Sequence, residues 1–184
     1  MGVDIHVHIC KYNPEDNFYH ELSLYRPRDE DEKYNYDKEG NKILVKDKYI
    51  RISPYDARNS EMFDGMTHGD TENGYGCFPA YSIAFNSLEP NFREEIKKKT
   101  KILGFYDFNE ISFADFKNYL NEHPTVVDYD SDEWETWKNT EPKPQKKNPL
   151  NDLFDYCVNY ANFAEKYGMF APYSQYKILF WFDN

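Results

Sequence analysis

Residues 2–11 alternate between apolar and polar side chains. The apolar positions are Val3, Ile5, Val7 and Ile9, and the polar positions between them are Asp4, His6, His8 and Cys10. Alternation with a period of two, carried by β-branched residues, is typical of a strand with one buried face. Residues 2–11 are therefore predicted to be a strand whose apolar face is packed and whose polar face lines a groove.

Other short apolar runs predict further strands. A run at 17–25 follows the turn signal Asn13-Pro14-Glu15-Asp16, and two shorter runs lie at 43–45 and 49–52. The run at 176–182 is apolar at both odd- and even-numbered positions, which is typical of a strand buried on both faces. This last strand is therefore expected in the centre of a sheet.

A periodicity of three to four residues predicts three to four helices. The third of the expected helices has the clearest signals, because Ser112 and Asp115 resemble a capping box, while Phe113, Phe116 and Leu120 form an apolar stripe. The expected helical ranges are 54–66, 91–103, 112–120 and 151–167.

The order of these elements favours the α+β class, because strands and helices are grouped rather than strictly alternating. We expect a single domain over 1–184, with a mixed or antiparallel sheet in which the N- and C-terminal strands are central. The ranges 26–42 and 128–149 are expected to be exposed, the first as a loop or a hairpin arm. The length of 184 residues is short for an eight-stranded α/β barrel, which usually needs about 250.

Composition narrows the classes of function. The chain has 33 acidic and 22 basic residues, a net charge of −11, which argues against a broad phosphate-binding surface. An acidic surface that occupies a basic groove on a partner is compatible with this charge. Three sparse cysteines argue against a disulfide framework. With no signal-peptide pattern and no membrane-spanning run, we expect a soluble protein of the cytoplasm with no membrane contact.

Asp4, His6 and His8 are the first candidate site. Neighbouring positions on one face of a strand lie about 7 Å apart, and carboxylate and imidazole groups ligate divalent metals such as Mg²⁺, Mn²⁺ or Zn²⁺. The Asp-x-His-x-His string resembles the first strand of amidohydrolase and related metal-dependent phosphoesterase barrels, although the chain is too short for such a barrel. A solvated polar face without a metal explains the same pattern.

A second candidate group lies in the Gly-rich range 67–79 and just before it. If this range folds over the first strand, His68 and Asp70 join the first-strand residues in a metal site, with Asp64 close by. Turns use Asp and Gly for backbone reasons alone, which is the competing interpretation. Arg58 precedes this range, and its guanidinium would either clamp a phosphate or carboxylate or form a structural ion pair.

Three segments together resemble a family of uncharacterised bacterial and phage proteins. Members open with Met-Gly-Cys-Asp-Ile-His, where this chain has Met1-Gly2-Val3-Asp4-Ile5-His6 with Val3 in place of Cys. Members carry an Arg-Asn-x-x-x-Phe element, matched from Arg58 to Phe63, and close with Trp-Phe-Asp-Asn, matched at 181–184. A weaker likeness is a Ser followed by a hydrophobic helix, matched from Ser112. No motif aligns within 26–50 or 128–149.

The resemblance implies a phage or mobile-element setting and no particular reaction. Because both ends of the chain carry the signature, we expect the first and last strands to lie side by side. Asp183 and Asn184 would then lie near one end of the strand that holds Asp4, His6 and His8.

Three hypotheses about function follow. In the first, the protein is an anti-CRISPR-like inhibitor of an RNA-guided nuclease of host defence. It then acts by metal- or His-dependent cleavage of guide RNA at Asp4, His6, His8 and Arg58. In the second, it is a non-catalytic acidic mimic of nucleic acid that blocks a basic groove. In the third, it is a small metal-dependent phosphoester hydrolase. The partner expected in the first two is the host nuclease or its guide RNA complex.

Overall fold

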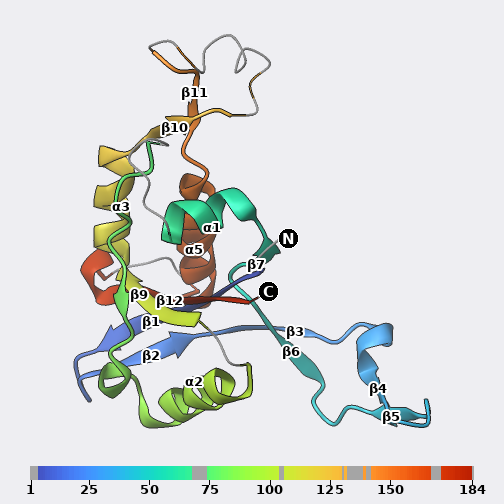
Figure 1. Cartoon of the computed structure of the whole chain (residues 1–184). Coiled ribbons are helices and arrows are strands. Elements are labelled where there is room, and N and C mark those ends of the chain that lie inside the picture. The colour runs from blue at the N-terminus through green and yellow to red at the C-terminus, as the bar shows by residue number, and fades with distance from the viewer. Residues whose placement is uncertain are drawn as a thin grey trace.

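The computed structural model describes residues 4–67, 74–103, 106–129, 131, 139, 142–166 and 171–183. Within these ranges the chain forms a six-stranded antiparallel sheet, four α-helices and three small two-stranded sheets (Figure 1). The predicted α+β class is therefore confirmed.

The large sheet is organised around its first and last strands. β1 (Asp4–Asn13) pairs antiparallel with β12 (Tyr176–Asp183) through eight consecutive register pairs, from Asp4 opposite Asp183 to Lys11 opposite Tyr176. Both strands are central, and the two ends of the described chain meet, as the sequence predicted. The remaining strands attach on either side in the order β2-β1-β12-β9-β8. Their bounds are β2 (Phe18–Leu22), β9 (Tyr106–Ser112) and β8 (Tyr81–Ser82).

A short strand, β7 (Asp56–Arg58), completes the sheet. It pairs antiparallel with residues 4–6 of β1, on the edge that β2 occupies further along. The sequence pattern had predicted a helix over 54–66, and this prediction is wrong for the first half of the range. Three residues are too few to show an alternation, and β7 forms because the edge of β1 is open there. The helix α1 (Ser60–Thr67) follows directly.

One face of the sheet carries the larger core. Ile5, Val7 and Ile9 of β1 are at most 1% exposed, in agreement with the predicted packed face. They contact three helices, which lie together on one side of the sheet in Figure 1. These helices are α1, α3 (Phe113–Glu122) and α5 (Leu150–Ala164).

The ends of two of these helices follow local signals. Ser112 caps α3, because its hydroxyl accepts a hydrogen bond from the Asp115 backbone amide at 3.0 Å and donates one to the Asp115 carboxylate at 2.7 Å. This confirms the predicted start of that helix. At the start of α5 the Asn148 side chain accepts from the Leu150 amide at 3.0 Å.

The second face of the sheet is covered by α2 (Pro90–Leu103), which lies alone on the opposite side in Figure 1. Phe92 and Ile96 of this helix contact Cys10, Leu179 and Trp181, a smaller buried cluster. The predicted groove along the polar face of β1 is therefore wrong beyond its first residues. Apolar residues from β12 share that face, and their burial requires a cover.

A hairpin arm projects from the sheet and spans residues 24–52 (Figure 1). Its base is the pair β3 and β6, and its tip is the pair β4 and β5. The range 26–42, which the sequence predicts to be an exposed loop or hairpin arm, lies entirely within this arm. The bounds are β3 (Leu24–Pro27), the 3-10 helix η1 (Glu30–Lys33), β4 (Tyr34–Tyr36), β5 (Lys42–Leu44) and β6 (Tyr49–Ile52).

A second small projection is the pair β10 (Thr125–Val127) and β11 (Gln145–Lys147). Much of the range 128–149 between these strands lies outside the described residues. The other short elements are the 3-10 helices η3 (Phe85–Ser87) and η4 (Tyr173–Gln175). No helix in the described ranges is both long enough and apolar enough to cross a membrane.

The main core is expected to dominate stability. Replacing Leu153 of α5, which is fully buried, by Ala should lower the free energy of unfolding by about 2–5 kcal/mol, because it leaves a cavity. Phe163→Ala on the same helix is the control, since Phe163 is 74% exposed and its loss should change stability by about 0.5 kcal/mol or less. Denaturant titration of the two variants measures the difference. Equal destabilisation would contradict this description of the core.

Candidate functional site

Five polar positions meet at one end of the central sheet. Asp4 lies opposite Arg58 of β7 on one side and opposite Asp183 of β12 on the other. His6 lies opposite Asp56 and Trp181 in the same two strands. Residues directly opposite in antiparallel strands lie about 4.5–5.5 Å apart at Cα and belong to the same face of the sheet. We call Asp4, His6, Asp56, Arg58 and Asp183 the sheet-end cluster.

The cluster unites three segments that are far apart in the sequence. Asp4 and His6 belong to the opening motif, Arg58 begins the Arg-Asn element, and Asp183 belongs to the closing motif. The structure brings these positions into adjacent register through β1, β7 and β12. The expectation that Asp183 lies near one end of the first strand is confirmed, and the structure shows that this is the Asp4 end. Asp56 is a member that sequence reasoning missed.

A row of stacked rings fixes the imidazole of His6. His6 stacks on Trp181 with ring centroids 5.5 Å apart and an interplanar angle of 23°. The same indole stacks on His8 at 5.0 Å and on Phe108 at 5.1 Å. Trp181 is 4% exposed, so this row is held rigidly between the sheet and α2. His6 is half-buried at its end, next to the carboxylate positions of the cluster.

His8 has a different environment from His6. It is 3% exposed, and its Nδ1 lies 2.5 Å from the carboxylate of Glu21 on β2. Arg51 of β6 forms an ion pair with the same carboxylate, and its Nη2 lies 2.8 Å from His8 Nδ1. A guanidinium can only donate hydrogen bonds. An ionised carboxylate can only accept, so Nδ1 of His8 carries the proton that it donates to Glu21. The Arg51 guanidinium then donates to the same carboxylate rather than to Nδ1.

The charges of this triad follow from burial and pairing. Burial lowers the pKa of His8 below 6.5, and the neighbouring Arg51 adds to this effect. Burial alone would raise the pKa of Glu21, but the hydrogen bond from His8 and the charge of Arg51 lower it overall. His8 is therefore neutral, Glu21 is ionised, and the triad joins the arm to the sheet.

A buried lysine lies on the same face, and sequence reasoning missed it. Lys177 is 4% exposed, and its ammonium donates to Glu110 at 2.8 Å and to Ser87 at 2.9 Å. It also lies 4.1 Å from the ring centroid of Tyr19. The available signal was a single charged residue inside the apolar run 176–182. Its pairing makes it a structural cation, while burial raises the pKa of the neighbouring Cys10 thiol and keeps that thiol protonated.

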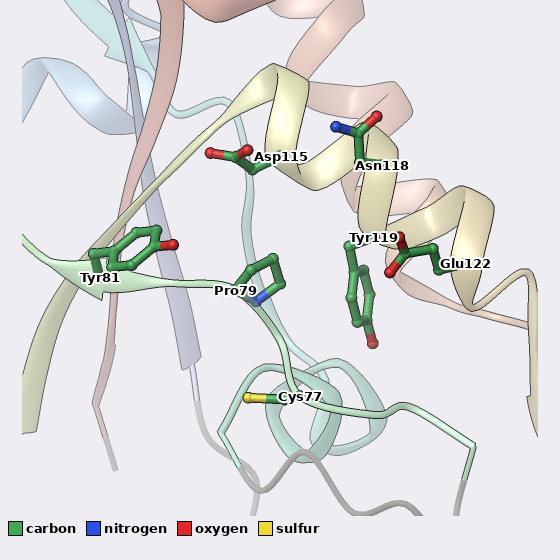
Figure 2. A pocket seen from close by; sticks show the side chains of 7 residues that line it. All are labelled: Cys77, Pro79, Tyr81, Asp115, Asn118, Tyr119 and Glu122. Atoms are coloured by element: carbon green, nitrogen blue, oxygen red, sulfur yellow. The ribbon is translucent and has the colours of Figure 1, made fainter.

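A separate hollow of about 190 Å³ lies beside α3, on the other face of the sheet (Figure 2). Figure 2 shows Cys77, Pro79 and Tyr81 on one side of it, facing the side chains of the helix. Two of these helix side chains already have hydrogen-bond partners within the protein. Asp115 accepts from the cap Ser112, and Tyr119 donates to the Tyr75 carbonyl at 2.6 Å. None of the residues that line this hollow belongs to the sheet-end cluster.

The predicted metal ligands divide into two groups. Asp4, His6 and His8 lie on β1 as predicted, whereas His68 and Asp70 lie outside the described residues. Within the described part of the chain, no three His, Cys, Asp or Glu side chains are grouped as a metal site. A divalent metal at this end of the sheet, with His68 and Asp70 among its ligands, stays a prediction.

Comparisons with models of protein families, with curated proteins and with solved structures found no match to this chain. The likeness to phage and bacterial proteins and its implications therefore remain predictions.

The buried His8 predicts a pH dependence of stability. In the folded state its pKa is lowered, whereas in the unfolded chain it titrates near pH 6.5. The contribution of the neutral, buried His8 to the free energy of unfolding is therefore fully present above about pH 6.5. It is lost as the pH falls towards the lower folded pKa, because the unfolded chain binds the proton more readily. Denaturant titrations from pH 8 to pH 5 should show this loss.

The matched variant is His8→Asn, whose amide can still donate to Glu21 but does not titrate. Its free energy of unfolding should fall less steeply between pH 6.5 and pH 5 than that of the unaltered protein. If both proteins lose stability with the same slope in this window, His8 is not the neutral buried group described here.

Proposed function

We propose that the sheet-end cluster is a hydrolytic site that acts on a phosphodiester, and that its substrate is RNA. The observation that carries this proposal is the register of β1, β7 and β12, which groups three carboxylate residues, one imidazole and one guanidinium residue at one end of the sheet. Acidic residues, His and Arg are the residue types that orient water or a metal, transfer a proton and bind a phosphate.

His6 is the proton-transfer residue in this proposal. Asp56 holds the register position opposite His6, and a carboxylate residue is the residue type that orients an imidazole in such sites. The stack on Trp181 limits the ring to a narrow range of orientations. Positioning of this kind is a large part of catalysis, because a reacting group held in place does not have to be ordered during the reaction. His6 would protonate the leaving oxygen or deprotonate the attacking water.

The other cluster members have roles that follow from their residue types and register positions. Arg58 is the residue that would bind the phosphate, and Asp4 lies between Arg58 and Asp183 in register. The carboxylates of Asp4 and Asp183 would orient the attacking water, or a divalent metal if one is used. His8 has a positioning role, because it is buried, paired with Glu21 and stacked on the same indole as His6.

The biological setting in the proposal is inhibition of host defence, with the guide RNA of a nuclease as the substrate. The likeness of the opening, Arg-Asn and closing segments to phage proteins supports this setting. The acidic net charge of −11 supports approach to a basic nucleic-acid channel of such a partner. Binding to that channel without cleavage is the competing outcome of the experiment below.

His6→Ala tests the proposed reaction. Loss of a general acid or base typically reduces the rate about 10²–10⁴-fold. The rate at which the protein cleaves labelled single-stranded RNA, free or loaded in a nuclease, should therefore fall at least about 10²-fold. The melting temperature should move by no more than about 4 °C, since few core contacts are lost. Parallel reactions with Mg²⁺, Mn²⁺ and EDTA report whether a metal takes part.

His20→Ala is the control, because His20 is an exposed histidine whose Nε2 lies 2.7 Å from the Asp16 carboxylate, away from the cluster. It should cleave RNA at the unaltered rate. A well-folded His6→Ala protein with full activity would exclude the cluster from the reaction. Intact RNA with every variant, together with a blocked nuclease, would replace this proposal by a non-catalytic acidic mimic.

A further inference from the structure

The base of the arm contains a hollow between two exposed aromatic rings. Its volume is about 590 Å³, and it is lined by Tyr25, Asp47, Lys48 and Tyr49. Tyr25 is 62% exposed and Tyr49 is 59% exposed, although rings of this size are usually at least half-covered in a folded chain. Exposed tyrosines occur elsewhere in the chain, such as Tyr81 at 65%, but Tyr25 and Tyr49 line the same hollow.

The register sets the spacing of the two rings. Tyr25 lies opposite Arg51 and Pro27 lies opposite Tyr49, which makes Tyr25 and Tyr49 diagonal neighbours on one face of the β3–β6 pair. Diagonal neighbours are separated by about 7–8 Å. Backbone positions at that spacing allow one flat ring to fit between the two side chains, because each aromatic contact needs about 3.5–4.0 Å.

The charge around the hollow differs from that of the rest of the chain. Residues 42–50 contain three basic side chains and one acidic side chain, which gives a local charge of 3 − 1 = +2 in a chain whose net charge is −11; the next basic residue, Arg51, is paired with Glu21. Lys48 lies at the hollow itself. The acidic side chain, Asp47, also lines it and offers acceptor oxygens for the amino group of a base.

The turn that presents these groups is held in place. The backbone amide of Arg28 donates to the Lys48 carbonyl at 3.1 Å, and its guanidinium Nε donates to the Asp47 carbonyl at 2.9 Å. At the other end of β6, Arg51 pairs with Glu21 of the sheet. The hollow is therefore preformed, which reduces the entropy lost when a ligand binds.

We propose that this hollow binds one unpaired base of single-stranded RNA, stacked between Tyr25 and Tyr49, with Lys48 next to the adjoining phosphate. Aromatic platforms beside basic side chains are the usual way in which proteins bind single strands. A protein partner would also use exposed tyrosines, but the local positive charge in an acidic chain favours a polyanion. This inference rests on the proposed function, since it assigns the binding site for the same RNA.

The hollow is within reach of the sheet-end cluster along the chain. β6 ends at Ile52 and β7 begins at Asp56, so Tyr49 and Asp56 are seven residues apart. An extended chain of that length spans at most about 25 Å. A single strand anchored by one base at the arm can therefore extend to the cluster.

The test measures binding of a fluorescent single-stranded RNA decamer to the full chain by anisotropy. All proteins carry His6→Ala, so that the RNA is not consumed. Adding Tyr25→Ala or Tyr49→Ala should weaken binding about 5- to 100-fold, the range expected for the loss of one base–aromatic stack. Tyr49→Phe should bind as tightly as the parent, because a phenyl ring also stacks.

Tyr81→Ala is the matched control, since Tyr81 is 65% exposed and lies on β8, away from the arm. It should leave the affinity unchanged. A duplex of the same sequence should bind more weakly than the single strand, because its bases are already stacked. Heparin, a polyanion without bases, should bind the Tyr25→Ala and Tyr49→Ala proteins as it binds the parent.

The result that overturns the inference is equal RNA affinity in the parent and in both tyrosine-to-alanine variants. Failure of the parent to bind RNA at all overturns it too and leaves a protein as the occupant of the hollow. The cleavage assay with His6 restored separates this result from failure of the proposed function. Tyrosine-dependent binding without cleavage retains the hollow and rejects the reaction. If the tyrosine variants cleave RNA with an unchanged KM, the reaction is retained and the hollow is rejected as the RNA-binding site.

Discussion

The pairing of β1 with β12 is the interaction on which the rest of the structure depends. It joins the two ends of the described chain and buries a continuous apolar row on one face. β2 and β7 attach to the free edge of β1, and β9 attaches to that of β12. This pairing joins residues up to 183 − 4 = 179 positions apart in the sequence, so the centre of the sheet requires both β1 and β12.

The same pairing creates the sheet-end cluster. It places Asp183 opposite Asp4, and it leaves the edge of β1 open for β7, which brings in Asp56 and Arg58. A shift of one residue in the register would exchange the two faces of the strand. It would move Ile5 to the side of the cluster and His6 into the main core. The packing of Ile5, Val7 and Ile9 therefore fixes the positions of the polar residues as well.

The second face of the sheet combines apolar packing with buried charges. His8, Glu21 and Arg51 form one paired group, and Lys177 with Glu110 forms another. Unpaired charges at these depths would be costly. The first group also fixes the arm, because Arg51 belongs to β6 while its two partners belong to the sheet. The arm, the sheet and the cluster are thus linked by hydrogen bonds as well as by the chain.

The sequence predicted elements with strong local signals. The alternation at 3–9, the capping residue Ser112 and the apolar run 176–182 each have a local physical cause, and each appears in the structure as expected. The side-by-side termini were also predicted, through the likeness of the two end motifs rather than through periodicity.

The failures have a common cause in tertiary contacts. β7 is three residues long and is defined by the open edge of β1, so no pattern in residues 56–58 could indicate it. β9 was missed as a strand, although it holds Phe108 and Glu110 beside β12. The distinction between His6 and His8 could not be predicted either. Both occupy the same face of one strand, and only the placement of Glu21, Arg51 and α2 buries His8.

We propose that RNA reacts at the sheet-end cluster, which β1, β7 and β12 form. An NMR titration of the protein with a short single-stranded RNA tests it most directly, with the backbone amides and the imidazole protons of His6 as reporters. We expect shift changes at Asp4, His6, Asp56, Arg58 and Asp183 that saturate together with those of Tyr25 and Tyr49 in the arm. Saturable changes confined to other surfaces, with the cluster unaffected, would contradict it.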